Sequence, residues 1–384
     1  MARNQAQLEK RCVRLLSRIE LNQSAREQVG ALLKGPLDWQ RIEALAVKEG
    51  VAGLLYNHLS HLDCVEGDSE CHLVELRHRY FVNVANALRT EQELRVLLKA
   101  LELDKVAILV FKGIALVQNV YRKSGLRGYC DVDILVRDEE WPGMLTVLLR
   151  LGYRSMPEYP NWFSNGRLDI DLHRDPFGFS KNPYRQLAFN LDTRALWRDS
   201  RMRLLAGHPV RQFSLEDELL VLSAHAVKHS FEKMIWVVDL AEMVNRYAAD
   251  IDWDTLLQKA YQSKLDRPLY FIFQWARTHL EVTIPDFVVR GLQPQPQVIA
   301  EKLLYRGIDC GKETPKVAEL IYFSAIQGFC ERIKFMCEAV CPRDSIRKQI
   351  YGWYHTPLAF CFLILRLIQT AFFGLRLSCQ LLFR

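Results

Sequence analysis

The chain has 384 residues, of which 49% are hydrophobic and 25% are charged, a composition that excludes a disordered protein and leaves room for two or three domains. Its formal net charge of +6 permits an anionic partner, but lysine and arginine are spread along the chain, so no specific nucleic-acid motif is indicated. Ten cysteines without a close CxxC pair predict reduced thiols in a cytoplasmic protein rather than a disulfide framework.

The amino-terminal part of the chain is predicted to be helical. Apolar residues recur at intervals of three and four in residues 15–19, 42–55 and 88–101, which is the spacing of an amphipathic helix. We therefore expect a helical region over residues 1–87, with the last of these helices leading into the next module.

A change of hydrophobic period marks the start of a mixed α/β module, predicted over residues 88–200. Val106 to Phe111 is a continuous apolar run rich in β-branched residues, as a buried strand requires. Val132 to Val136 is a second such run, and Leu168 to His173 alternates polar and apolar residues as a third strand would. A small mixed sheet between helices is expected.

Helical periodicity returns downstream of this module and predicts a helical region over residues 201–283 that packs on the core. Its first helix is expected to run from Ser214 to about Tyr247. The proline-containing stretch Ile284 to Gln297 is the predicted linker to a helical carboxyl-terminal region, residues 298–384. The order of elements indicates an α+β fold with helical flanks.

The last segment, residues 356–384, is predicted to be an amphipathic helix. Its arginine and glutamine side chains gather on one narrow sector, while phenylalanine and leucine cover the rest. No stretch of about 18 residues is free of charge, which disfavours a simple membrane span. A thin cationic stripe beside a broad apolar face fits peripheral contact with the inner membrane, and it fits packing against the protein or a second subunit equally well.

Two carboxylates stand at the start of the second predicted strand, Asp131 and Asp133. Strand geometry directs residues i and i+2 to the same face. Adjacent carboxylates repel one another, and a divalent cation such as magnesium relieves that repulsion. On its own the DxD pattern is weak evidence, because solvated strand ends carry it by accident.

Asp171 strengthens the case, since it lies inside the third predicted strand, where burial without a partner would be costly. Asp131, Asp133 and Asp171 are the three acids that two-metal phosphoryl transfer requires, and we predict them as metal ligands and catalytic residues. Asp169 and His173 share the strand face of Asp171, as second-sphere ligands or as solvated side chains.

Upstream residues offer groups for phosphate. Lys112 and Gly113 lie between a strand and a helix, where a closely approaching backbone and a helix amino terminus can meet an anion. Arg127 could neutralise a leaving pyrophosphate. The alternative roles are a turn glycine and a solvent-facing cation.

Several segments, taken together, resemble the signatures of one family. In order, the chain carries Phe111-Lys112-Gly113-Ile114-Ala115-Leu116, Gly125-Leu126-Arg127, Asp131-Val132-Asp133-Ile134-Leu135-Val136, Leu151-Gly152-Tyr153 and Asp171-Leu172-His173. These resemble the LKG-x-A-L, G-x-R-x-x-x-D-[ILV]-D-[IL]-L-V, L-G-Y and [ED]-L-H motifs of the bacterial uncharacterised nucleotidyltransferase family, within the polymerase-β-like superfamily. The resemblance implies a nucleotidyltransferase-type sheet, bound magnesium, and transfer of a nucleoside monophosphate from an NTP, expected to be ATP, to an unidentified acceptor.

The resemblance continues over His225-Ala226-Val227-Lys228-His229 and Trp236-Val237-Val238-Asp239-Leu240-Ala241, which are similar to the H-x-x-K-H and W-x-x-D-L-A segments of that family. If this helix packs beside the acids, Lys228 and His229 could contact phosphate or acceptor; otherwise they form a polar helix face. A zinc site is disfavoured because no third ligand completes the histidine pair. Asp239 is expected to anchor helix packing.

Three functions compete at this stage. Metal-dependent nucleotidyl transfer explains Asp131, Asp133 and Asp171 together. A DxD glycosyltransferase explains only the first pair and lacks a nucleotide-binding βαβ half before it. A catalytically inactive, nucleotidyltransferase-like binding or membrane-attached module remains the third reading.

Overall fold

The computed structural model describes most of the chain. The described residues are 2–61, 73–157, 159–177, 188–294, 322–323, 326 and 328–340. The predicted amphipathic helix at residues 356–384 lies outside them. Among the described residues, none of the helices combines the length and the apolar character needed to cross a membrane.

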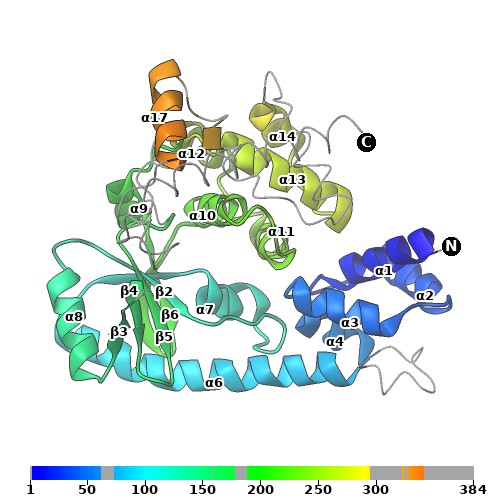
Figure 1. Cartoon of the computed structure of the whole chain (residues 1–384), viewed down its shortest axis with the longest axis horizontal. Coiled ribbons are helices and arrows are strands. Elements are labelled where there is room, and N and C mark those ends of the chain that lie inside the picture. Colours follow the sequence, from blue (N-terminus) through cyan, green and yellow to red (C-terminus); the bar gives the residue numbers. More distant parts are fainter. Residues whose placement is uncertain are drawn as a thin grey trace, which may run out of the picture.

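The amino-terminal region is helical, as predicted. Its helices are α1 (Ala2–Leu16), α2 (Gln23–Leu33), α3 (Trp39–Lys48), α4 (Ala52–Leu59) and α6 (Val74–Leu103). Side-chain carboxyl or amide oxygens cap two of them, because Asn22 accepts from the amide of Ala25 and Asp38 accepts from that of Arg41. Figure 1 shows α1 to α4 as a group to one side of the sheet, while α6 runs below both, from α4 to the sheet.

A seven-stranded mixed sheet forms the centre, in the order β3-β4-β5-β2-β1-β7-β6. The strands are β1 (Ile108–Phe111), β2 (Val132–Val136), β3 (Arg154–Met156), β4 (Tyr159–Ser164), β5 (Asp169–His173), β6 (Arg201–Leu205) and β7 (His208–Gln212). β2 pairs antiparallel with β1 and parallel with β5. The three strands predicted from the sequence, β1, β2 and β5, are therefore neighbours at the middle of the sheet.

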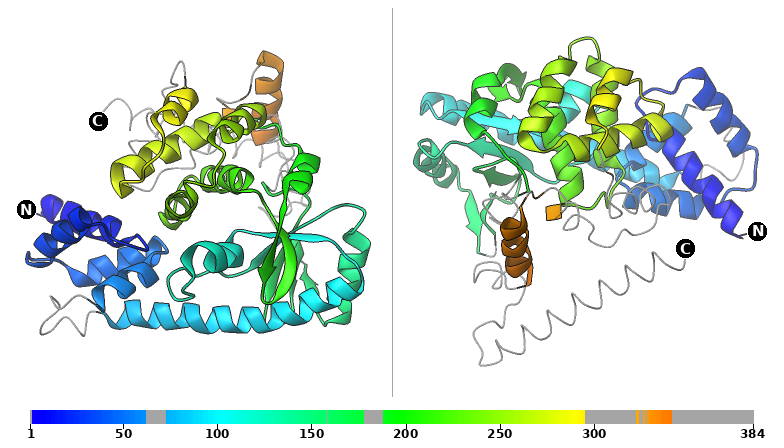
Figure 2. Two further views of the ribbon diagram at one scale, coloured as in Figure 1. Left: turned by 180° about the vertical axis from the view of Figure 1, so that it is seen from behind. Right: turned by 90° about the horizontal axis from the view of Figure 1, so that it is seen from above.

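The two faces of the sheet pack against different layers. Alternate residues Val110, Ile134 and Ile170 belong to a buried cluster with leucines of α6 and α8 (Trp141–Arg150). Leu109 and Leu135 belong to a larger cluster with the helices of the other side. Figures 1 and 2 show α6 and α8 on one side of the strands and the downstream helices on the other. The functional residues described below lie on the second face.

The downstream helices are α9 (Thr193–Asp199), α10 (Leu215–Lys228), α11 (Ile235–Tyr247), α12 (Trp253–Ser263), α13 (Asp266–Leu280), α14 (Asp286–Leu292) and α17 (Phe329–Val340). The helix expected from Ser214 to Tyr247 is two helices, α10 and α11. Ser230 and Phe231 have φ angles of 53° and 55°, and two successive left-handed residues end a right-handed helix.

Two further expectations need correction in detail. The stretch Ile284 to Gln297, predicted as a linker, contains α14, which is held against α13 because Val288 and Leu292 are buried in the same core. The sheet also extends beyond residue 200, where the core was expected to end, since β6 and β7 add to its β1 edge. The α+β class with helical flanks is confirmed, while the division into domains stays a prediction.

The loop that precedes β2 is fixed by a close approach of backbones. A Cβ atom on Gly53 of α4 would lie 2.1 Å from the carbonyl oxygen of Gly125, and one on Gly125 would lie 2.3 Å from the Tyr80 ring. A side chain at position 53 would collide with backbone, and one at position 125 would require the Tyr80 ring to move. A short helix, α7 (Gly113–Leu116), and a π-helix, η1 (Val117–Tyr121), lead into this loop from β1.

Candidate active site

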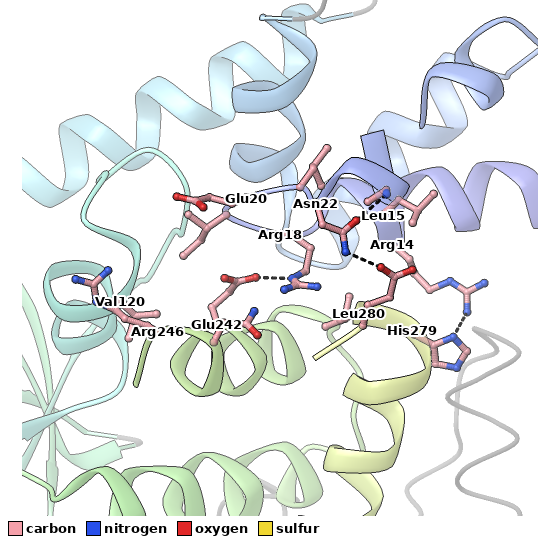
Figure 3. Close-up of a pocket in the computed structure, with 15 residues that line it drawn as sticks. Arg14, Leu15, Arg18, Glu20, Asn22, Val120, Glu242, Arg246, His279 and Leu280 are labelled. Atoms are coloured by element: carbon pink, nitrogen blue, oxygen red, sulfur yellow. Dashed lines mark hydrogen bonds and ion pairs between the residues drawn. The ribbon is translucent and has the colours of Figure 1, made fainter. Parts of the chain in front are cut away.

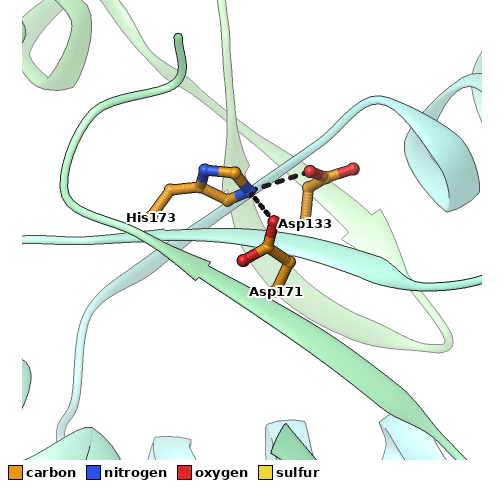
Figure 4. Close-up of side chains that lie close together, drawn as sticks. All are labelled: Asp133, Asp171 and His173. Atoms are coloured by element: carbon orange, nitrogen blue, oxygen red, sulfur yellow. Dashed lines mark hydrogen bonds and ion pairs between the residues drawn. The ribbon is translucent and has the colours of Figure 1, made fainter. Parts of the chain in front are cut away.

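The register of β2 and β5 places two predicted acids side by side. Asp133 is the Cα partner of Asp171 in this parallel pair, and paired residues on adjacent strands project to the same face. His173 lies two residues beyond Asp171, on that face as well. Ligand atoms of the three side chains lie within 4.8 Å of one another (Figure 4), an arrangement able to hold a metal ion.

The His173 imidazole lies between the two carboxylates. Its Nε2 is 2.9 Å from Asp133 Oδ1 and 3.2 Å from Asp171 Oδ2. Burial by itself would lower the pKa of His173, but its hydrogen bonds to the two carboxylates outweigh burial and raise it. The two carboxylates therefore favour the protonated form of His173 where they meet.

Lys112 supplies a second cation. Its Nζ donates to Asp133 Oδ1 at 3.0 Å and lies 4.7 Å from the centre of the Phe111 ring. Burial would raise the pKa of Asp133, but Lys112 and His173 more than offset this and hold that pKa well below its usual range. Asp133 is consequently ionised in the folded protein at neutral pH.

Asp131 stands beside this group, one residue before β2. It is outside the three side chains that meet within 4.8 Å, but burial and the neighbouring charge of Asp133 raise its pKa to about 6. The structure thus brings Asp133 and Asp171 into contact through His173 and leaves Asp131 alongside. We refer to Lys112, Asp131, Asp133, Asp171 and His173 as the acidic cluster.

Gly113 lies against the loop that leads into β2. A Cβ atom there would be 3.2 Å from Tyr129 Cβ and 3.4 Å from the carbonyl oxygen of Asp131. The absence of a side chain therefore lets the start of α7 approach the loop that carries the acids. Its predicted contact with phosphate stays a prediction.

Arg127 forms its hydrogen bonds with residues outside the acidic cluster. Its Nε and Nη2 donate to the two carboxylate oxygens of Asp239 on α11, at 3.2 and 2.8 Å, and its Nη1 donates to the carbonyl oxygen of Gly128. Tyr121 Oη donates to the same carboxylate at 2.7 Å. These contacts show Asp239 anchoring helix packing, as expected, while a role of Arg127 at pyrophosphate stays a prediction.

Lys228 and His229 lie at the end of α10, partly buried. The rings of His225, His229 and Trp236 pack together, with centroids 4.7 to 5.2 Å apart. Burial, followed by the charge of Lys112, lowers the pKa of His225 well below its ordinary value. Because His225 interacts electrostatically with Lys112 and Asp133, this end of α10 lies near the acidic cluster.

Glu218 is a functional candidate that sequence reasoning missed. It is 8% exposed, and its Oε1 accepts from the backbone N–H of Lys112 at 3.2 Å. Burial raises the pKa of Glu218 to about 7, against the opposing effect of the Lys112 amide and ammonium. In the sequence it is one of three acids in the first turn of α10, which is where acids ordinarily stabilise a helix.

A cavity of about 520 Å³ lies away from this group (Figure 3). Its wall comes from the end of α1, from α11 and from the end of α13, and it includes the ion pair Arg18–Glu242 at 2.7 Å. The described lining residues contain no member of the acidic cluster. The volume of this cavity therefore does not identify the candidate active site.

Comparison with known proteins gives one match. A family model described as an uncharacterised nucleotidyltransferase covers residues 35–281, which include α3, α4, α6, the whole sheet and the helices α10 to α13. No curated protein and no solved structure gives a significant match to the chain. The matched range contains every member of the acidic cluster, together with Arg127, Glu218, Lys228 and His229.

Proposed function

Because this chain belongs to the uncharacterised nucleotidyltransferase family, we propose that its acidic cluster transfers a nucleoside monophosphate from a magnesium-bound NTP to an acceptor. The observation that carries the proposal is the pairing of Asp133 with Asp171 across adjacent strands, with His173 within reach of both. In this reaction the acceptor's nucleophilic atom bonds to the α-phosphorus, the bond to the bridging oxygen breaks, and pyrophosphate leaves.

The donor set fits a hard divalent cation. Three carboxylates, those of Asp131, Asp133 and Asp171, lie around Lys112 and His173, and carboxylate oxygens are the ligands that magnesium prefers. Magnesium bound here would neutralise the triphosphate and polarise the α-phosphate. Asp133 and Asp171 would hold it, with Asp131 as the third acid, and His173 would keep the two strand carboxylates in place.

The remaining residues prepare the site for an anion. Lys112 neutralises Asp133 in the structure and would meet the triphosphate once the cation takes over that carboxylate. Asp171, at the other side of His173, would help to hold the metal that activates the attacking group of the acceptor, whose proton passes to solvent. Lys228 and His229, near the cluster at the end of α10, are proposed contacts for phosphate or acceptor.

Label transfer tests the proposal. The purified protein is incubated with magnesium, a cell extract and each NTP labelled at the α-phosphate, and labelled products are separated and identified. We expect one NTP, with ATP the first candidate, to give a labelled acceptor and pyrophosphate. Asp171→Asn should abolish labelling, whereas Asp138→Asn, which removes an exposed carboxylate outside the cluster, should not.

Calorimetry with ATP and magnesium separates an active enzyme from an inactive relative. A protein that binds ATP and magnesium but labels nothing in any extract would be a nucleotide-binding module. A protein that binds neither would contradict the proposed function. Contact of residues 356–384 with a membrane or a subunit and the cytoplasmic location stay predictions.

A further inference from the structure

The backbone of Lys112 adopts a conformation that favours glycine. Its φ and ψ angles are 55° and −138°, a region that a residue with a Cβ atom enters only when its surroundings hold it there. Non-glycine residues in such regions gather at functional sites. Lys112 joins β1 to α7, so this conformation sets the direction in which both the side chain and the following helix leave the strand.

One side chain from another element holds that backbone. Glu218 Oε1 accepts from the Lys112 N–H at 3.2 Å, across 106 residues of sequence. The other two acids of the same helical turn act elsewhere: Glu216 accepts from the amide of Asp252, and Asp217 pairs with Lys259. Of these three carboxylates, that of Glu218 bonds to the residue that joins β1 to α7.

Holding the Lys112 backbone in one conformation also restricts the position of the Lys112 ammonium. Lys112 is 7% exposed, and its Nζ lies 3.0 Å from Asp133 Oδ1 and 4.7 Å from the Phe111 ring centre. A long lysine side chain has many rotamers in water, so holding its base in one conformation reduces the number of positions the ammonium can occupy. Glu218 is thus linked to Asp133 through Lys112.

From this geometry we propose that Glu218 is a positioning residue that locks the Lys112 backbone and so aims its ammonium at the acidic cluster, where it meets the triphosphate. The triphosphate part rests on the proposed function; the lock on the backbone does not. The hydrogen bond of Glu218 is to the backbone of Lys112 and not to the acids. Its influence passes through Lys112, which makes the proposal testable as a coupling between the two residues.

A double-mutant cycle tests the coupling with ATP and magnesium as the probe. Glu218→Met keeps side-chain length but removes the acceptor, and should weaken ATP binding about tenfold. Glu218→Gln keeps an acceptor oxygen and should recover most of that loss. In the Lys112→Ala background, Glu218→Met should change the affinity by less than about twofold. An equal loss in both backgrounds, or no loss in either, overturns the proposal.

Glu216→Met is the matched control, because it removes a buried acceptor from the same turn of α10 but faces Asp252. It should destabilise the fold without coupling to Lys112. Coupling of Glu216 to Lys112 as strong as that of Glu218 would show a general effect of α10 and overturn the specific role.

Thermal unfolding without nucleotide tests whether Glu218 holds the Lys112 backbone, and it does so even if the wild type binds no ATP. Lys112→Gly should melt above Lys112→Ala, the reverse of the usual order, because glycine adopts φ 55° without strain. Glu218→Met should lower the Tm less in the Lys112→Gly background than in the Lys112→Ala background. The usual order of alanine above glycine, or equal shifts in both backgrounds, would overturn the lock, whereas absent ATP binding alone would count against the proposed function.

Discussion

Two buried groups of charged side chains lie on the same side of the sheet, and both are built from segments that resemble the family's motifs. In the first, Arg127 and Asp239 form a two-bond ion pair that Tyr121 completes. In the second, the acidic cluster, three carboxylates face Lys112 and His173. In the first group the charges of Arg127 and Asp239 balance. The acidic cluster holds more carboxylates than cationic side chains.

This difference in charge balance distinguishes a structural ion pair from a site that can bind a ligand. A matched pair such as Arg127–Asp239 joins the loop before β2 to α11 and leaves little for a ligand to gain. An excess of buried carboxylate is costly in the free protein, and a divalent cation removes that cost on binding. Charge balance, which depends on the partners of each side chain, therefore distinguishes a site from a structural pair where residue type does not.

The largest expected effect is on turnover. Asp133→Asn should lower kcat by about a thousandfold, equivalent to about 4 kcal/mol of lost transition-state stabilisation. The amide oxygen still accepts from Lys112 and His173, so circular dichroism and gel filtration should match the wild type. Steady-state release of pyrophosphate measures the rate, and near-normal turnover would remove the acidic cluster from the mechanism.

Substitution in the Arg127–Asp239 ion pair should lower the stability of the fold and leave the chemical step unaffected. Arg127→Met leaves the Asp239 carboxylate buried without its cation, since the two side chains are 10% and 1% exposed, and should lower the free energy of unfolding by about 3 kcal/mol. Urea unfolding measures it. The double variant Arg127→Met/Asp239→Asn should recover part of the loss.

Turnover per folded molecule of Arg127→Met then decides the predicted pyrophosphate role. A drop far beyond the fraction unfolded would place Arg127 in the reaction and weaken the contrast between the two groups. A drop that follows stability would leave Arg127 as a structural residue.

Asp131→Asn should make the magnesium-free protein more stable at pH 7, by about 1 to 2 kcal/mol. The folded pKa of about 6 exceeds the ordinary 3.8, so the destabilisation caused by this carboxyl grows between about pH 4 and pH 6 and is complete above pH 6. The gain should disappear below about pH 4, where the carboxyl is protonated in both states. Melting curves with and without magnesium test this, and a loss of stability in the magnesium-free protein would contradict it.

The smallest effect concerns His225 on α10. Burial, and then the charges of Lys112, His229 and Lys228, lower its pKa well below 6.5, against the opposing charge of Asp133. The unfolded chain takes up a proton below pH 6.5 and the folded protein does not, so stability falls as the pH falls, by at most about 1.4 kcal/mol at pH 5.5. His225→Phe should reduce the acid sensitivity of the Tm, and an unchanged slope would refute the assignment.

Much of the fold could be predicted because local patterns set it. The runs at Val106 to Phe111 and Val132 to Val136 are apolar enough to require burial on both faces, and they are β1 and β2 in the structure. β3, β4, β6 and β7 were not predicted. Their residues are largely exposed or only partly buried, so pairing with neighbours, rather than an apolar pattern, makes them strands.

By itself the sequence determined which segments carry charge into apolar strands, since the alternation of side chains along a strand is a local property. It could not determine partners. Arg127 and Asp239 are 112 positions apart in the sequence, and Glu218 and Lys112 are 106 apart. His173 is 2 positions from Asp171 and 40 from Asp133. The register of β2 and β5, together with the packing of the sheet against α10 and α11, fixes these contacts, because a buried charged group bonds to the partner that the fold places within hydrogen-bonding distance.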